Sequence, residues 1–205
     1  LGFVINSKDM SVTLTDERKK KLVDACDALL RYSKVKIRAV ASCIGLMVSS
    51  LAAVPLGQLH YRSLERSKNR ALKLSHGNWD KVMTLTEEEK TDPSWWVQNL
   101  HSQKGQVRVM PATHCLITDA SGSTGWGAVF NSPNKVETST QGLWSVEDKC
   151  FHINILELKA VLFGLQSLCY HISNTHVLVR SDNTTVVSCI NNKGSSRSSD
   201  LAELS

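Results

Sequence analysis

The chain has 205 residues, of which 41% are hydrophobic and 21% are charged. This length allows one large domain or two small ones, and the apolar fraction is sufficient for a packed core. No run of about 18 apolar residues occurs, so the sequence predicts no transmembrane helix. The first ten residues lack the basic-then-apolar layout of a signal peptide, and the chain starts without a methionine, as expected of a piece of a longer protein.

Charge divides unevenly along the chain. Residues 1–110 contain 18 lysines and arginines against 11 aspartates and glutamates, a net charge of +7. Residues 111–205 contain 6 against 8, a net charge of −2. A basic half beside a mildly acidic half suggests a polyanionic partner and an anionic or metal-binding site in the second half. The alternative is a solvated, lysine-rich helix surface, which charge alone favours.

The cysteines predict free thiols. None of the six is paired as CxxC, and most stand in apolar runs, which indicates buried thiols in a reducing compartment rather than a disulfide framework or a zinc site. The seven histidines are scattered without HxxxH spacing, so each is expected to be structural.

The first half reads as mostly helical, in chain order. Residues 1–5 and Ser11–Leu14 predict a hairpin, and Thr15 then predicts the cap of a helix whose first turn is acidic. Further helices are expected over residues 37–50 and 58–74. Thr86 and Glu89 form a capping-box pattern at the start of a fourth helix, which is expected to break or restart near Pro93. Residues 101–113 read as a linker.

After residue 111 the pattern changes to mixed α/β. Strands are predicted over residues 114–118, 126–130, 140–144 and 175–180, and helices over residues 154–169 and 184–192. Residues 132–140 read as a polar hairpin loop. The element order is β-β-β-α-β-α, and the fold class of the whole chain is mixed α/β with a mostly helical N-terminal half.

Three acids in the second half fall inside or at the ends of apolar elements. Asp119 ends the first strand, Glu157 lies within an apolar helix, and Asp182 ends the fourth strand. If the two strands are parallel neighbours, their carboxyl ends lie at one edge of the sheet, where ligands bind in open α/β sheets. Three converging carboxylates repel unless cations neutralise them, and oxygen ligands suit Mg²⁺ or Mn²⁺. Two such ions about 4 Å apart perform the chemistry of many nucleases.

Each acid also has an ordinary structural explanation. Asp119 stands beside a turn, where Asp and Ser bond the local backbone. Asp182 with Asn183 fits the cap of the next helix, and Glu157 fits a solvated helix edge. Singly these explanations are at least as probable as a site, but all three acids at the right element ends favour a shared site.

The acidic blocks resemble a known family. TDAS with GWGAV, HINILELKA and SDNTT resemble the first three blocks of a type 1 ribonuclease H domain, and more narrowly those of DIRS-like, tyrosine-recombinase-type retrotransposon polyproteins. LGFVINS resembles the primer-grip hairpin of a reverse transcriptase, and IRAVASCIGLMVSS, LHYRSLERSKNRAL and the WW helix resemble the thumb and connection that follow it. The resemblance therefore implies a thumb/connection-like region over residues 1–110 and a C-terminally truncated ribonuclease H-like domain over residues 111–205.

The resemblance also implies roles. Asp119, Glu157 and Asp182 match the family's first three catalytic metal ligands, which hold two Mg²⁺ or Mn²⁺ ions. Asn154 matches a family position that touches the minor groove of the hybrid, and Ser121 and Asn183 are expected to contact the nucleic-acid backbone because they stand next to the first and third acids. The implied substrate is the RNA strand of an RNA–DNA hybrid, which the 2′-hydroxyl distinguishes from DNA. The implied reaction is hydrolysis that leaves a 5′-phosphate and a 3′-hydroxyl.

Two departures from the family pattern keep other functions open. The family's fourth acid belongs to a region beyond Ser205, with Asp200 and Glu203 coming too early, and its polymerase aspartates lie upstream of Leu1. A nucleic-acid-binding remnant without catalysis is therefore the main alternative. An ATP-binding protein of the actin-like kind is the third, because DASGSTGWG fits its first phosphate loop, although Glu157 within a helix argues against it. An integrase-type nuclease fits less well, because its acids follow the order Asp, Asp, Glu.

Overall fold

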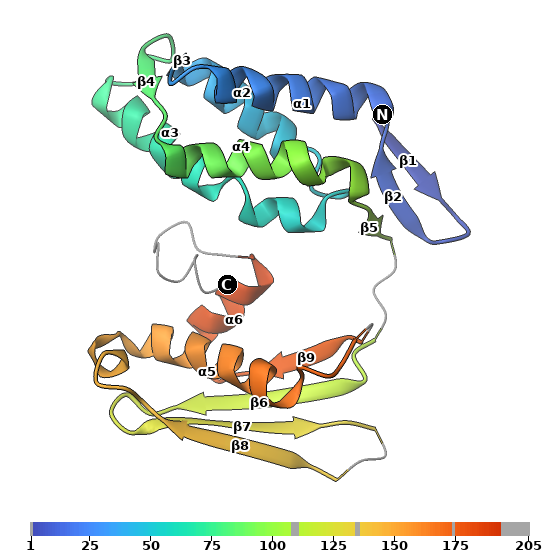
Figure 1. The fold of residues 1–205 in the computed structure, drawn as a ribbon, viewed down its shortest axis with the longest axis vertical. Coiled ribbons are helices and arrows are strands. Elements are labelled where there is room, and N and C mark those ends of the chain that lie inside the picture. The colour runs from blue at the N-terminus through green and yellow to red at the C-terminus, as the bar shows by residue number, and fades with distance from the viewer. Residues whose placement is uncertain (1, 108–110, 134–135, 174, 194–205) are drawn as a thin grey trace. The chain divides into compact units, whose positions relative to one another are not determined.

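A computed structural model describes residues 2–107, 111–133, 136–173 and 175–193, and its fold is mixed α/β (Figure 1). The chain divides into two compact units, unit 1 over Leu1–Val109 and unit 2 over Met110–Ser205. Among the described residues, no helix is long and apolar enough to cross a membrane. The predicted fold class, with a mostly helical first half and a mixed second half, is confirmed.

Unit 1 combines four helices with two small antiparallel sheets among its described residues. One sheet has the order β1-β2-β5, and the other pairs β3 with β4. The predicted hairpin is confirmed by β1 and β2, which pair from Phe3↔Leu14 to Asn6↔Ser11. The elements are β1 (Phe3–Asn6), β2 (Ser11–Leu14), α1 (Asp16–Arg31), β3 (Lys34–Lys36), α2 (Ile37–Val48), the 3₁₀ helix η1 (Pro55–Leu59), α3 (Arg62–Leu74), β4 (Val82–Thr84), α4 (Glu87–Asn99), the 3₁₀ helix η2 (Leu100–Ser102) and β5 (Gly105–Gln106).

Both helix starts predicted from capping residues are confirmed. The Thr15 hydroxyl accepts a hydrogen bond from the Arg18 backbone N–H at the start of α1. At α4 the Thr86 hydroxyl accepts from the Glu89 N–H, and the Glu89 carboxylate accepts from the Thr86 N–H at 2.7 Å. Each pairing satisfies a backbone donor that the helix itself cannot.

Three expectations for unit 1 were wrong. The helix α4 runs through Pro93 without a break, because Pro93 and Trp96 are both buried and their packing offsets the missing N–H. The third helix starts only at Arg62, after a separate 3₁₀ turn. Part of the expected linker forms β5, which pairs with β2 through Ser11↔Gln106 and Val12↔Gly105.

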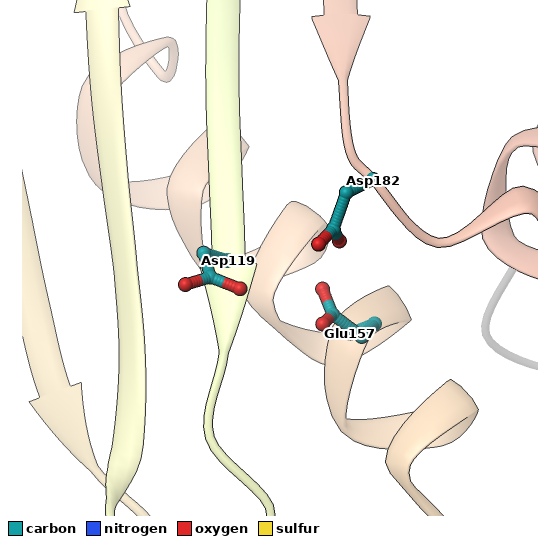
Figure 2. Close-up of side chains that lie close together, drawn as sticks. All are labelled: Asp119, Glu157 and Asp182. Atoms are coloured by element: carbon teal, nitrogen blue, oxygen red, sulfur yellow. The ribbon is translucent and has the colours of Figure 1, made fainter.

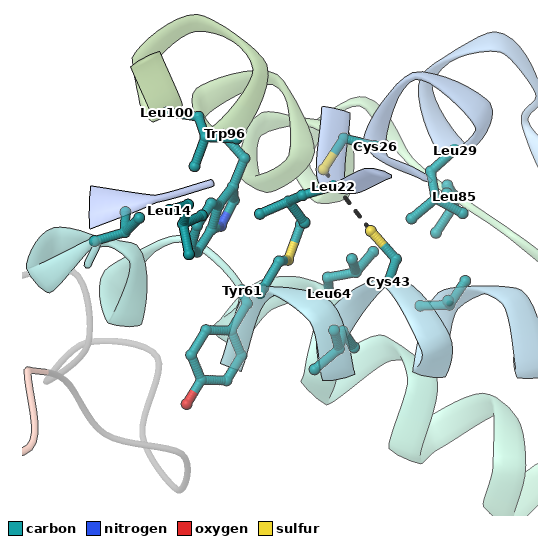
Figure 3. Packing of buried hydrophobic residues seen from close by; sticks show 14 of the residues in the cluster. Leu14, Leu22, Cys26, Leu29, Cys43, Tyr61, Leu64, Leu85, Trp96 and Leu100 are labelled. Atoms are coloured by element: carbon teal, nitrogen blue, oxygen red, sulfur yellow. Dashed lines mark hydrogen bonds between the residues drawn. The ribbon is translucent and has the colours of Figure 1, made fainter. Parts of the chain in front are cut away.

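The core of unit 1 is centred on side chains from α1, α2 and α4 (Figure 3). Trp96 is fully buried, and its indole Nε1 donates to the His60 carbonyl at 2.7 Å. Its ring lies over Gly57, where an added Cβ would come within 2.4 Å of the indole Cη2. This close approach fixes η1 against α4.

The cysteines follow the prediction of free thiols with one difference. Cys26, Cys43, Cys115, Cys150 and Cys169 are free thiols. Cys26 and Cys43 are buried with their sulfur atoms 3.8 Å apart, and this hydrogen bond together with burial raises the pKa of the Cys26 thiol. Cys150 is exposed, contrary to the expectation of burial.

Unit 2 has the predicted order β-β-β-α-β-α. Its sheet has the order β8-β7-β6-β9, with β6 parallel to β9 and the other pairs antiparallel. The strand β8 starts at Thr138, inside the expected loop, and pairs with β7. The elements are β6 (His114–Ala120), β7 (Gly125–Asn131), β8 (Thr138–Leu143), the 3₁₀ helix η3 (Asp148–Cys150), α5 (Ile153–Leu168), β9 (Val177–Arg180) and α6 (Thr184–Asn191).

The helix α5 lies against one face of this sheet (Figure 1). Leu156 and Ala160 are fully buried on it. At Gly164 the helix comes so close that an added Cβ would lie 2.9 Å from the Ala128 Cβ and 3.3 Å from Leu116 Cδ2. Because α5 packs this closely on the sheet, the side chains of its first turns are held at a fixed distance from the ends of the strands.

Candidate metal centre

The three predicted acids come together in unit 2 (Figure 2). Asp119 lies near the end of β6, Glu157 one turn into α5, and Asp182 just after β9. Because β6 and β9 are parallel neighbours, paired from His114↔Val177 to Ile117↔Arg180, their carboxyl ends meet at one edge of the sheet. One carboxylate oxygen from each acid lies within 4.8 Å of the others.

The electrostatics of this cluster are unfavourable without a counter-charge. Asp119 and Asp182 are exposed, whereas Glu157 is only 4% exposed, and its Oε2 is buried without a hydrogen-bond partner. Burial, followed by the charges of Asp119 and Asp182, raises the pKa of Glu157 from 4.5 to about 7. An unpaired buried carboxylate oxygen beside two further carboxylates is costly, and a bound cation removes that cost.

The donor set fits a hard divalent cation. All three donors are carboxylate oxygens, which suit Mg²⁺ and Mn²⁺, while softer metals favour nitrogen and sulfur ligands. The buried Glu157 Oε2 has no hydrogen-bond partner and is therefore available as a ligand atom. The three acids therefore form a possible metal-binding site.

The ordinary explanations do not match the structure for Glu157 and Asp182, but the one for Asp119 does. The cap of α6 is Asn183 rather than Asp182, because the Asn183 Oδ1 accepts from the N–H groups of Thr185 and Val186. Glu157 does not reach solvent. Asp119 does bond the local backbone, because its Oδ1 accepts from the Ala120 N–H at 2.9 Å, while Ser121 accepts from the N–H groups of residues 123 and 124.

The three predicted nucleic-acid contacts flank the acids in different ways. Ser121 is exposed in the β6–β7 turn, where its carbonyl accepts from the Trp144 indole at 2.6 Å. Asn154 and Asn183 are hydrogen-bonded to each other, with the Asn183 Nδ2 donating to the Asn154 Oδ1 at 2.9 Å. The helix α5 is capped by His152, because the His152 Nδ1 accepts from the Asn154 N–H.

A hollow beside Asp119 was not foreseen from the sequence. It has a volume of about 600 Å³, and its lining includes Asp119, Ser121, Trp126 and Gln141. The cross-strand register places Gly127 between Asp119 and Gln141 on one face of the sheet, and an added Cβ on Gly127 would meet nothing within 4 Å. Only the strand register, which the sequence alone does not fix, could have indicated Gln141.

The raised pKa of Glu157 predicts a pH-dependent stability. A folded-state pKa of about 7 against 4.5 means that the folded chain binds this proton more tightly than the unfolded chain. The resulting stabilisation is complete below pH 4.5 and is lost as the pH rises through about 7. In a chelator, we expect the melting temperature of the chain to fall between about pH 5 and about pH 8, and Mn²⁺ to restore it at the higher pH.

The matched control is Glu157→Gln. Burial also raises the pKa of Asp92 in unit 1 to about 6, and the stability it gives is lost over an overlapping pH range. The informative quantity is therefore the melting temperature of wild type minus that of Glu157→Gln, which should rise as the pH falls from about 8 to about 5. Parallel profiles for the two proteins across this range would contradict the prediction.

Comparisons with known proteins give structural neighbours only. No protein-family model matches the chain, and no curated protein matches it. A foamy viral protease-reverse transcriptase in complex with dsDNA aligns with 93% of the chain at 14% identity and a TM-score of 0.39. The same kind of protein in complex with an RNA/DNA hybrid aligns with 100% at 13% identity and a TM-score of 0.40, and a dRH form with dsDNA aligns with 92% at 15% identity and a TM-score of 0.36. The chain spans only 26% to 37% of the length of these proteins.

Proposed function

We propose that this chain carries the metal-dependent catalytic centre of a ribonuclease H-type enzyme that cleaves the RNA strand of an RNA–DNA hybrid. The observation that carries the proposal is the convergence of Asp119, Glu157 and Asp182, with their oxygens within 4.8 Å on a β6–α5–β9 framework. The acid order Asp, Glu, Asp along this framework is the order of the family that the sequence resembles. The buried, unpartnered Glu157 Oε2 supports a cation as the missing partner.

Each acid has a distinct part in the proposed chemistry. Asp119 and Asp182 are exposed, so their carboxylates would be accessible to the phosphodiester, whereas the Glu157 carboxylate is buried. Two bound Mg²⁺ or Mn²⁺ ions would activate a water and stabilise the charge that develops on the leaving oxygen. The water gives up a proton to solvent as its oxygen bonds to phosphorus, and the 3′-oxygen takes up a proton as its bond to phosphorus breaks, which leaves a 5′-phosphate and a 3′-hydroxyl.

Recognition of RNA is proposed for the polar residues beside the acids. Ser121 is exposed two positions after Asp119, and the amides of Asn154 and Asn183 stand next to Glu157 and Asp182. Hydroxyl and amide groups at these points can hydrogen-bond a ribose 2′-hydroxyl, the group that distinguishes RNA from DNA. The hollow of about 600 Å³ beside Asp119 offers room for a nucleotide.

For unit 1 we propose a thumb/connection-like role in holding the same nucleic acid. Its α3 carries five basic side chains: Arg62, Arg66, Lys68, Arg70 and Lys73. Lysine and arginine bind phosphates through charge, so hybrid binding should weaken as salt rises. The polymerase chemistry of a reverse transcriptase is not part of the proposal.

The test is cleavage of a hybrid whose RNA strand is labelled. With Mg²⁺ or Mn²⁺ we expect cuts in the RNA strand that leave 3′-hydroxyl ends, and a chelator should stop them. The DNA strand and a DNA duplex of the same sequence should remain intact, because they lack the 2′-hydroxyl. Salt-sensitive hybrid binding without cleavage would instead identify a nucleic-acid-binding remnant, and stabilisation by ATP alone would identify a nucleotide-binding protein.

A further inference from the structure

A hydrogen bond joins Asn183 and Asn154, which lie near two of the three acids in the sequence. Asn183 directly follows Asp182, and Asn154 lies one turn before Glu157 on α5. The Asn183 Nδ2 donates to the Asn154 Oδ1 at 2.9 Å, and this contact is partly buried. The bond therefore connects the segment that carries Asp182 to the helix that carries Glu157.

Asn183 is fixed at its other end as well. Its Oδ1 accepts from the Thr185 N–H at 3.0 Å and from the Val186 N–H at 3.2 Å, which caps α6. Its backbone N–H donates to the Ser181 hydroxyl at 3.1 Å. One side chain thus uses its oxygen to start α6 and its nitrogen to reach α5, with Asp182 immediately beside it.

Asn154 does not cap α5, so its side-chain amide is available for this hydrogen bond. The N-terminus of α5 is capped by His152, whose Nδ1 accepts from the Asn154 backbone N–H at 3.2 Å. The Asn154 Oδ1 faces Asn183 rather than the helix end. Its amide therefore acts between two elements rather than within one.

We infer that Asn154 and Asn183 are positioning residues that set the distance between Glu157 and Asp182 for the bound cation. This inference rests on the metal centre proposed above. Without a cation the acids repel one another, so the segment after β9 is driven away from α5 unless something holds it. The hydrogen bond between the two amides keeps this segment in place, as hydrogen bonds around metal ligands commonly do.

The expected effect is on cation affinity. Loss of a hydrogen bond that orients a metal ligand typically weakens metal binding by about 10- to 100-fold. The two amides form one bond, so removing either should cost as much as removing both. The fold should be little affected, provided that the cap of α6 is kept.

Asn183→Ser separates the two uses of Asn183. Serine is as good an N-cap as asparagine but has no amide to reach Asn154. Asn154→Ala removes the acceptor, and the double variant completes the cycle. The control is Asn191→Ser, which makes the same replacement at the exposed far end of α6.

The readout is the dissociation constant for Mn²⁺, measured from the electron paramagnetic resonance signal of free Mn²⁺, beside the melting temperature in chelator. We expect each single variant to bind Mn²⁺ at least about 10-fold more weakly, with the double variant no weaker than the worse single variant. Asn191→Ser should bind like wild type, and all melting temperatures should agree within a few degrees.

The outcomes distinguish this inference from the proposed function. Wild-type affinity in Asn183→Ser and Asn154→Ala, or additive losses in the double variant, would overturn the positioning role alone. A wild-type chain that binds Mn²⁺ at this site but leaves the hybrid intact would overturn the ribonuclease function and leave the positioning role standing. A wild-type chain that binds no Mn²⁺ would overturn both.

Discussion

Asp119→Asn is expected to abolish metal-dependent cleavage of the hybrid. The substitution removes one of three converging carboxylates and leaves a neutral amide oxygen, a weaker ligand for a divalent cation. Changes even in groups that only support metal ligands cost about 10- to 100-fold in affinity or activity, so the loss of a ligand should exceed about 100-fold. The measurement is the initial rate of RNA cleavage at saturating Mg²⁺, compared with wild type.

Hybrid binding should survive in Asp119→Asn, because phosphate contacts by basic side chains do not involve this carboxylate. The control is Glu147→Gln, which neutralises an exposed acid of unit 2 outside the cluster and should cleave like wild type. If Asp119→Asn retains more than about a tenth of the wild-type rate at saturating metal, Asp119 is not a ligand of the catalytic ions.

Trp96→Ala is expected to have the largest effect on stability. The indole is fully buried, packs closely on Gly57 and donates to the His60 carbonyl. Truncation of a buried tryptophan to alanine costs about 3–5 kcal/mol, a large part of the 5–15 kcal/mol that stabilises a typical domain. The measurement is the free energy of unfolding in a denaturant titration.

Two controls define the origin of this loss. Trp96→Phe keeps most of the apolar contact but loses the bond to His60, so its cost should be clearly smaller than that of alanine. Trp79→Ala removes a tryptophan that is 37% exposed, and its effect should be small in comparison. Equal losses for Trp96→Ala and Trp79→Ala would show that Trp96 is not central to the core of unit 1.

The meeting of the three acids could be predicted because it depends on features that the sequence carries. Apolar runs that end in Asp119 and Asp182 indicate strands, and an intervening helix indicates a parallel crossover, which brings both strand ends to one edge. Glu157 stands three residues before the buried Ala160, so the two lie on the same side of the helix. Pattern and topology alone therefore placed the candidate site.

Features that depend on tertiary contacts could not be predicted. The strands β3 and β4 have three residues each, too short for a periodic pattern, and β5 exists only because β2 offers it a partner. The continuous helix through Pro93 reflects burial, which overrides the helix-breaking tendency of proline. The bond between Asn154 and Asn183 joins residues far apart in sequence, and no local pattern indicates which of their possible partners they choose.

The most direct test of the metal centre is anomalous diffraction from a crystal of this chain soaked in Mn²⁺. We expect an anomalous peak between Asp119, Glu157 and Asp182, within about 2.0–2.5 Å of an oxygen of each. The same soak of an Asp182→Asn crystal should give a much weaker peak at that position. A wild-type crystal at saturating Mn²⁺ with no anomalous density between the three acids would contradict the central claim that they form a metal-binding site.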